Sequence, residues 1–205
     1  MHLDESAILW SAPERERAGR PLLVLMHGYG SHEGDLFAMS PGLPLAPVVA
    51  SIRAPIPQGG GWAWFEFGAA PGEPASDQVD AAARAIIAWL DTLEYASVSL
   101  LGFSQGAVMA LQLLRHAPTR FTKTVALSGF IAHGIHAGDA QLALEKPRVF
   151  WGRGAADPVI PNAAIERTAA WMPEHTDSTV RIYEDLGHSI STAELGDFVS
   201  FLAEA

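Results

Sequence analysis

Short apolar runs alternate with longer amphipathic segments along most of this chain. Residues 22–26 form a continuous apolar run, typical of a strand buried on both faces of a mostly parallel sheet. Between residues 77 and 93 the apolar positions recur at helical spacing, which predicts an amphipathic helix. Ser76 is its predicted N-cap, with Asp77 in the first turn.

The same pattern predicts the other elements. The predicted strands cover residues 7–11, 22–26, 48–52, 122–127, 148–151 and 179–183, with a further strand that starts at Ala96 and leads into Gly102. The other predicted helices follow Gly106 up to Pro118 and cover 163–172 and 192–202. The segment 53–76, rich in Pro and Gly, is predicted to be a loop, and 128–146 a loop with a weak helix.

Strand and helix alternate from Ala96 onward, which predicts an α/β fold with a mostly parallel sheet and helices on both faces. We find no internal repeat, low-complexity tract or linker, so a single domain over residues 1–205 is expected. In such sheets, ligands bind outside the carboxyl ends of the strands. Functional residues are therefore expected in the segments that follow strands.

Composition narrows the functional classes. A hydrophobic content of 49% with 18% charged residues indicates a folded globular protein. A net charge of −10 disfavours binding to nucleic acid and to anionic membranes. The absence of cysteine excludes disulfides, thiolate zinc sites and a cysteine nucleophile. The acidic start of the chain lacks the features of a signal peptide, and no apolar run could span a bilayer, so we expect a cytoplasmic protein without membrane insertion.

A serine stands between a predicted strand and a predicted helix, in the sequence Gly102-Phe103-Ser104-Gln105-Gly106. The pattern G-x-S-x-G in this context predicts a sharp, strained turn that exposes the serine hydroxyl at the top of a sheet. The two glycines allow the start of the helix to pass close to the strand. Ser104 is thus the candidate nucleophile.

A serine nucleophile needs a base, and that base needs an acid to orient it. His188 follows directly after a predicted strand and a glycine, and it is the best candidate base. His116 lies near the far end of the helix and His175 at the opposite sheet edge, whereas His133 and His136 lie in a loop that could approach the serine.

Asp157 is the candidate acid, because it lies just past a predicted strand and before His188, in the chain order expected of such a triad. Asp177 precedes its strand, and Glu184 and Asp185 are close to His188 in sequence. Asp139 is another possible acid, but it does not follow a predicted strand that would direct it toward the serine.

The negative oxygen of a tetrahedral intermediate needs two backbone donors. The N–H of Gln105, at the start of the helix, is one candidate, and the N–H of Tyr29, after the strand 22–26, is the other. His27 is interpreted as a residue that braces this loop.

These motifs together resemble the phospholipase/carboxylesterase family, which includes bacterial carboxylesterases and acyl-protein thioesterases. The resemblance rests on Leu25–Gly30, Gly102–Gly106, Gly154–Pro161 and Leu186–Ile190, with Trp64-Phe65-Glu66 similar to a Trp-Phe-Asp element of the family. It implies a single-domain α/β-hydrolase without a large lid domain, a shallow site, and no metal or organic cofactor. The chain departs from the family pattern at Tyr29, where many members carry Leu, and at Ala107, where many carry Gly.

Four residues are predicted to contact the substrate: Trp64, Phe130, Val159 and Ile160. Trp64 belongs to an aromatic segment with Trp62, Phe65 and Phe67, which is either a wall of the acyl site or an anchor on the sheet. His133 and His136 have H-x-x-H spacing, but no third ligand is evident, so no metal site is predicted.

The sequence thus predicts a serine hydrolase that cleaves carboxylic esters or thioesters of small to medium acyl groups. The enzymatic alternatives are a lysophospholipase, an acyl-protein thioesterase, a peptidase and a dienelactone-type hydrolase. The non-enzymatic alternative is an α/β-hydrolase scaffold that acts as a binding module. The expected partner is a small-molecule ester or thioester, with no nucleic acid, and the chain is expected to be a monomer or homodimer.

Overall fold

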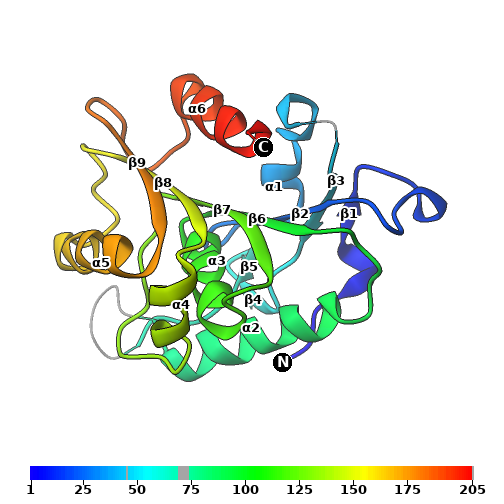
Figure 1. Ribbon diagram of the computed structural model, residues 1–205, viewed down its shortest axis with the longest axis horizontal. Coiled ribbons are helices and arrows are strands. Elements are labelled where there is room, and N and C mark those ends of the chain that lie inside the picture. Colours follow the sequence, from blue (N-terminus) through cyan, green and yellow to red (C-terminus); the bar gives the residue numbers. More distant parts are fainter. Residues whose placement is uncertain (45, 69–73, 205) are drawn as a thin grey trace.

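The computed structural model describes residues 1–44, 46–68 and 74–204. A seven-stranded sheet runs through its centre in the order β1-β3-β2-β6-β7-β8-β9 (Figure 1). All neighbouring strands of this sheet are parallel except β1 and β3. The strands are β1 (Leu9–Trp10), β2 (Leu22–Met26), β3 (Val48–Ile52), β6 (Val98–Phe103), β7 (Phe121–Leu127), β8 (Arg148–Gly154) and β9 (Asp177–Tyr183).

Helices cover both faces of the sheet, as Figure 1 shows. They are α1 (Gly34–Phe37), α2 (Ser76–Leu90), α3 (Gln105–His116), α4 (Asp139–Glu145), α5 (Asn162–His175) and α6 (Thr192–Ala203). Short 3-10 helices lie at Glu5–Ala7, Glu14–Glu16 and Ser40–Gly42. The fold class predicted from the sequence, a single-domain α/β fold with a mostly parallel sheet, is confirmed.

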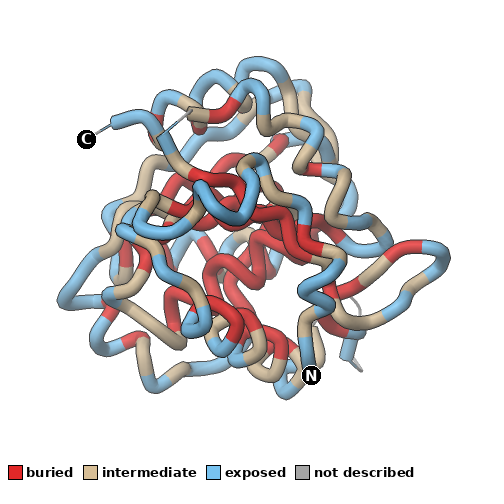
Figure 2. The backbone as a smooth tube through the Cα atoms, turned by 90° about the vertical axis from the view of Figure 1, so that its right-hand side faces the viewer, coloured by how far each residue is buried: buried red, intermediate tan, exposed pale blue. Residues whose placement is uncertain are grey.

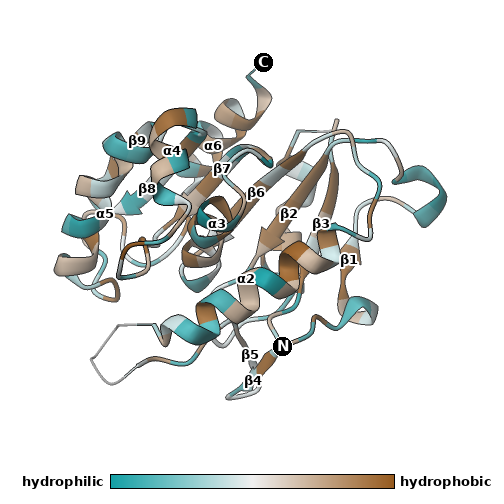
Figure 3. Cartoon of the chain, turned by 60° about the horizontal axis from the view of Figure 1, so that its bottom comes forward, coloured by the Kyte–Doolittle hydropathy of each residue, from teal (hydrophilic) through white to brown (hydrophobic). Residues whose placement is uncertain are grey.

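The alternation of side chains along the strands creates two apolar cores. In β2, Val24 and Met26 face one core, which contains side chains of α2, α3 and α5. Leu23 and Leu25 face the other core, which contains Phe198 and other side chains of α1 and α6. Because all five residues of β2 are buried, the strand reads as an unbroken apolar run. Buried backbone is concentrated in the middle of the molecule in Figure 2, and the central strands are the most hydrophobic part of Figure 3.

Several predicted boundaries need correction. The helix expected to start after a Ser76 cap includes Ser76, and Ala75 is the N-cap without a side-chain hydrogen bond. Strands β8 and β9 are longer than predicted, and α1 was not predicted. No helix among the described residues is long and apolar enough to cross a membrane.

Part of the segment predicted to be a loop is a β-hairpin, formed by β4 (Ile56–Gln58) and β5 (Gly61–Ala63). Its turn uses Gly59 and Gly60, both with positive φ, which glycine adopts without steric cost. The rest of that predicted loop includes residues 69–73, which lie outside the described residues. The hairpin matters for the site, because Trp62 pairs with Ser31 in the loop after β2.

Candidate active site

Ser104 occupies a strained turn between β6 and α3. Its backbone has φ 55° and ψ −117°, a conformation that non-glycine residues rarely adopt. Its N–H donates to Leu127 O (2.9 Å), and its carbonyl accepts the N–H groups of Ala107 and Val108. The turn is therefore held from β7 on one side and by the first turn of α3 on the other.

The glycines on either side of Ser104 are required by close backbone contacts. A Cβ on Gly102 would lie 2.1 Å from Gly106 O, and a Cβ on Gly106 would lie 1.8 Å from Met26 O. No side chain fits at such distances, so α3 can start this close to β2 and β6 only with glycine at both positions. This geometry agrees with the steric role inferred from the sequence.

Three side chains from separate loops meet at the carboxyl edge of the sheet. His188 Nε2 lies 2.9 Å from Ser104 Oγ, and His188 Nδ1 lies 2.7 Å from Asp157 Oδ2. The other carboxylate oxygen, Oδ1 of Asp157, accepts the N–H groups of Val159 (2.8 Å) and Ile160 (3.3 Å). The Asp157 side chain is 2% exposed and that of His188 18% exposed, so the acid is shielded and the imidazole is accessible.

This arrangement constrains the protonation of the imidazole. With Asp157 ionised, Nδ1–H of His188 donates to the carboxylate, which leaves Nε2 as the acceptor for the Ser104 hydroxyl. The ring of His188 also packs at 5.0 Å from the ring of Phe103. Orientation and tautomer are thus both fixed by contacts from other elements. The other histidines considered from the sequence, His116, His133, His136 and His175, do not hydrogen-bond to Ser104 within the described part of the chain.

Two backbone N–H groups close to the serine turn have no acceptor among the described residues. Gln105 is the first residue of α3, so its N–H has no intrahelical acceptor. Within the described ranges, Tyr29 N–H has no acceptor either. The loop that carries Tyr29 is close to the serine, since a Cβ on Gly28 would lie 3.4 Å from Ser104 Cβ.

The loop after β2 is braced from several directions. Gly30 N–H donates to Trp62 O (2.9 Å), and Trp62 N–H donates to Ser31 O (2.8 Å). His27 is fully buried, with Nδ1 bonded to Gly28 O (2.8 Å) and Nε2 accepting from Ala54 N–H (3.1 Å). Burial lowers the pKa of His27, which keeps the ring neutral in this role. The interpretation of His27 as a bracing residue agrees with these contacts.

A cavity of about 150 Å³ opens beside Ser104. Its lining residues are Phe65, Phe67, Ser104, Gln105, Val108, Phe130, Val159, Ile160 and Pro161. Three of the four residues predicted to contact the substrate, Phe130, Val159 and Ile160, are in this set. Val108 also lines the cavity and was not among the predicted residues, although a residue four positions after Ser104 on a helix lies on the same face.

Trp64 does not line the cavity, so its prediction as a substrate contact needs correction. It is fully buried, and its indole N–H donates to His27 O (2.8 Å). Phe65 and Phe67, which follow Trp64 beyond the end of β5, are the aromatic residues of this segment that line the cavity. Trp64 anchors the segment, the second of the two roles considered for these aromatic residues.

The side chain of Gln105 has a role that the sequence did not indicate. Its Oε1 accepts the N–H of Trp64 (3.0 Å), and its Nε2 donates to the carbonyl of Phe65 (2.8 Å). The amide is 4% exposed, so these bonds form in a water-poor environment where they hold the aromatic segment against the start of α3. One residue thus links the serine turn to the cavity wall.

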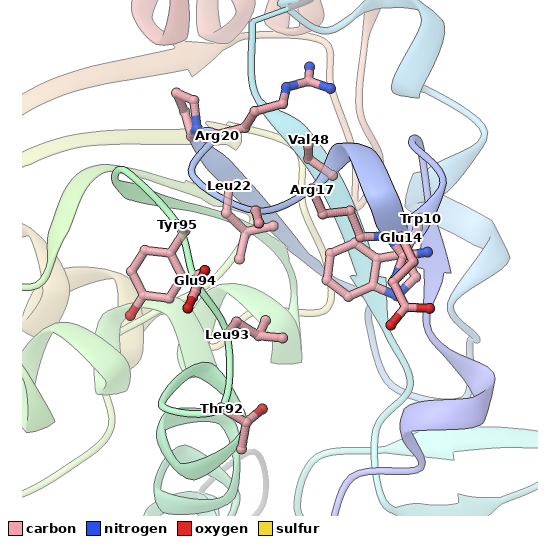
Figure 4. Close-up of a pocket in the computed structure, with 12 residues that line it drawn as sticks. Trp10, Glu14, Arg17, Arg20, Leu22, Val48, Thr92, Leu93, Glu94 and Tyr95 are labelled. Carbon is pink, nitrogen blue, oxygen red and sulfur yellow. The ribbon is translucent and has the colours of Figure 1, made fainter.

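A second cavity, of about 230 Å³, lies at the opposite edge of the sheet, where β2 and β3 begin (Figure 4). Its lining includes Trp10, with the Arg17 guanidinium 4.1 Å from the ring centroid. None of the described residues that line it is a serine or a histidine. The hydrogen-bonded pair of Ser104 and His188 therefore belongs to the smaller cavity at the carboxyl edge.

Comparison with known proteins agrees with this geometry. The family profile described as Phospholipase/Carboxylesterase matches residues 12–205, nearly the whole chain. The chain belongs to this family. It is therefore a carboxylesterase-family hydrolase with the α/β-hydrolase fold, as the motifs in the sequence suggested.

Among individual relatives, esterase YpfH of Escherichia coli is 28% identical over 200 residues, covering 88% of this chain and 81% of the relative. Acyl-protein thioesterase 1 of Saccharomyces cerevisiae is 32% identical over 108 residues, about half of each chain (51% and 48%). The crystal structure of esterase PE8 superposes with a TM-score of 0.78 at 27% identity and covers 98% of both chains. The Bacillus cereus carboxylesterase has a TM-score of 0.79 at 19% identity, covers 95% of this chain and 92% of its own, and shares the fold.

Proposed function

We propose that this chain hydrolyses carboxylic esters or thioesters of small to medium acyl groups through an acyl-enzyme on Ser104. The observation that carries the proposal is the continuous hydrogen-bond chain from Ser104 Oγ through His188 to Asp157, with distances of 2.9 and 2.7 Å. Family membership independently supports ester chemistry.

In the first step, Ser104 Oγ attacks the acyl carbon while His188 Nε2 takes the hydroxyl proton. Asp157 holds Nδ1–H and stabilises the imidazolium that forms. The proton on Nε2 then passes to the leaving alcohol or thiol. Water attacks the acyl-enzyme by the same path in reverse, which releases the acid and restores the serine.

The oxygen of the tetrahedral intermediate would be held by the N–H groups of Tyr29 and Gln105. Their lack of competing acceptors, and the position of Gln105 at the positive end of α3, support this assignment. Backbone donors are positioned by the fold before substrate binds, so no reorganisation is needed as negative charge develops.

The cavity beside Ser104 would receive the acyl group. At about 150 Å³ it is smaller than the roughly 300–1,000 Å³ of typical ligand pockets, which favours small acyl groups. Its rim is open, because Phe67 is 49% exposed and Val159 57% exposed. A longer chain could lie partly in solvent. A cytoplasmic location and a monomeric or homodimeric state remain predictions from the sequence.

The test is the hydrolysis of p-nitrophenyl esters, from acetate to decanoate, by wild type and by Ser104→Ala. We expect the variant to retain at most a few per cent of the wild-type rate, because no other group would attack the ester. Ser99→Ala, on the same strand β6, is the matched control and should retain activity. A higher residual rate in Ser104→Ala would reject the nucleophile, and no hydrolysis by wild type would favour the non-catalytic binding module.

An acyl-protein thioesterase is the second candidate, favoured by the partial match to the yeast proteins of that name. The chain spans about half their length, so their substrates do not transfer to it directly. Matched ester and thioester substrates with the same acyl group would separate the two functions. A kcat/KM that rises with chain length, and more for the thioester, would favour this candidate over a short-chain esterase.

A further inference from the structure

Two histidines and an aspartate converge on the face of the sheet that α2 and α3 cover, away from Ser104. Asp80 lies in α2, His116 is the last residue of α3, and His136 lies in the segment between β7 and α4. One potential metal-ligand atom from each lies within 4.8 Å of the others. Ser104 directly precedes α3 and lies twelve residues before His116, which places it about 18 Å away along the helix axis.

The cluster is held together by hydrogen bonds before any ion binds. His116 Nε2 and Asp80 Oδ1 are 2.9 Å apart, and Gln112 Nε2 donates to the same carboxylate oxygen at 2.7 Å. The rings of His116 and His136 lie 4.5 Å apart between centroids, at 60°. Outer-shell contacts of this kind orient ligands in metal sites.

Arg115, next to His116, fixes the segment that carries His136. Its guanidinium donates to Ala132 O (3.0 Å) and Gly134 O (3.0 Å), and it pairs with Asp139 at 2.8 and 3.1 Å. Asp139 Oδ2 also accepts His136 N–H (2.9 Å). The segment is thus held beside the end of α3, and Asp139 balances the charge of Arg115 that would otherwise repel a cation.

The protonation states suit a cation. Burial lowers the pKa of His136, so its imidazole is neutral at neutral pH and has a lone pair available. For Asp80, burial acts to raise the pKa, but hydrogen bonds from His116 and Gln112 outweigh it, so the pKa falls below its usual value. A neutral imidazole and an ionised carboxylate are the forms that bind metals.

We propose that Asp80, His116 and His136 bind a divalent transition-metal ion, with Zn²⁺ as the best match to two imidazoles and one carboxylate. Water would complete a tetrahedral shell. The sequence-based argument against a metal at His136, the lack of further ligands, is removed by Asp80 and His116, which come from distant segments. His133, its H-x-x-H partner, is exposed and outside the cluster.

Binding would require two small rearrangements. Ligands about 2.0–2.1 Å from a tetrahedral ion lie about 3.3 Å apart, so the 2.9 Å contact of His116 with Asp80 must open slightly. For Nε2 of His116 to bind the ion, the proton that it donates to the Asp80 carboxylate must leave this nitrogen, and the ring proton is then on Nδ1. Gly138 N–H donates to His136 Nδ1 at 3.1 Å. Coordination through either ring nitrogen ends this bond, since Nδ1 then holds either the metal or a proton. The ion would join α2, α3 and the segment after β7 as a structural link.

The experiment uses the full chain, first treated with chelator and then titrated with Zn²⁺ by calorimetry. We expect one equivalent to bind, with a rise in Tm of about 5–10 °C at a free Zn²⁺ concentration near 100 times Kd. In ¹⁵N-labelled protein, the Gly138 amide resonance should shift, because its acceptor is lost. A structural link also predicts that ester hydrolysis does not depend on Zn²⁺.

His116→Ala, His136→Ala and Asp80→Asn should each weaken binding at least tenfold, whereas the matched control His133→Ala should bind as wild type does. Far-UV circular dichroism and retained ester hydrolysis would show that the variants are folded. If a variant unfolds, the Gly138 shift in wild type still decides the question. Absence of binding to wild type, or binding that leaves Gly138 unshifted and survives all three substitutions, would overturn the proposal.

Discussion

At the scale of single residues, Glu194 is a buried carboxyl group without an evident partner. It lies in the first turn of α6, is fully buried, and its Oε1 would be 2.3 Å from a Cβ on Gly152. Neither carboxyl oxygen has a hydrogen-bond partner among the described residues. Burial raises the pKa of Glu194 from 4.5 to about 7. The folded protein therefore keeps a proton here that the unfolded chain releases.

This difference gives stability a defined dependence on pH. Since the folded pKa lies above the unfolded value of 4.5, stability falls as pH rises from about 4.5 to about 7 and is then level. The contribution is of the order of 3 kcal/mol. Glu194→Gln, which cannot ionise, should gain stability relative to wild type by about this amount between pH 4.5 and pH 8. Urea unfolding of both proteins across this range is the measurement, and a difference that does not change with pH would contradict the assignment.

The candidate site could be found from the sequence where a residue lies just past the carboxyl end of a predicted strand. Ser104, Asp157 and His188 were selected on that ground, and they form the hydrogen-bonded chain. Trp64 was selected because it belongs to an aromatic segment, and the sequence does not show which aromatic side chains of that segment line the cavity. The amide contacts of Gln105 were equally hidden, because its partners are backbone groups about forty residues away.

At the scale of elements, the turn that holds Ser104 depends on the close approach of α3 to the sheet. A Cβ at position 106 would lie 1.8 Å from Met26 O. This atom is a backbone oxygen of β2, which cannot move aside as a flexible side chain could. The helix would have to shift away from the strand. Position 106 is therefore expected to tolerate no side chain.

Gly106→Ala should destabilise the protein by about 3 kcal/mol or more, through overpacking. Gly196→Ala is the matched control, since Gly196 lies inside α6 and its Cβ would meet nothing within 4 Å. That change should stabilise by about 0.5–1 kcal/mol, because alanine favours helices over glycine. Thermal unfolding of both variants is the check, and equal effects would show that the close approach does not determine stability.

Strands that are buried along their whole length were the easiest to predict. Strands β2 and β3 were found at their observed bounds because all five residues of each are buried. The exposed edge strand β9 and the three-residue strands of the hairpin gave weaker patterns. In the hairpin, Pro57 and Gly59 to Gly61 are residue types typical of loops, although β4 and β5 pair there as antiparallel strands. Short pairing of this kind is set by tertiary contacts, here with the loop after β2.

At the scale of the whole molecule, the sheet brings segments from distant parts of the chain to one edge. The turn after β6 and the loops after β7, β8 and β9 all contribute to the site or to its cavity. Phe130, after β7, is 5% exposed and closes part of the cavity. The size of the acyl group is expected to depend on such side chains and not on the triad.

Phe130→Ala should therefore shift the preferred p-nitrophenyl ester toward longer acyl chains, by about two carbons. Phe201→Ala is the matched control, because Phe201 is buried to a similar extent (4% exposed) in the core on the opposite face of the sheet. Both changes should lower stability by about 3–5 kcal/mol. Only the first should alter the ratio of kcat/KM for decanoate to that for acetate, and a parallel change in both variants would show that the cavity does not set chain length.

The most direct test of the account asks which atom becomes covalently modified. A fluorophosphonate reacts with a serine that has an activated hydroxyl, so wild type should gain one adduct and lose ester hydrolysis in parallel. After tryptic digestion, the adduct should lie on Ser104 within the peptide of residues 85–115. Ser104→Ala should remain unlabelled, while Ser99→Ala should label as wild type does. An adduct at any other residue, or no adduct on a hydrolytically active protein, would contradict the assignment of Ser104 as the nucleophile.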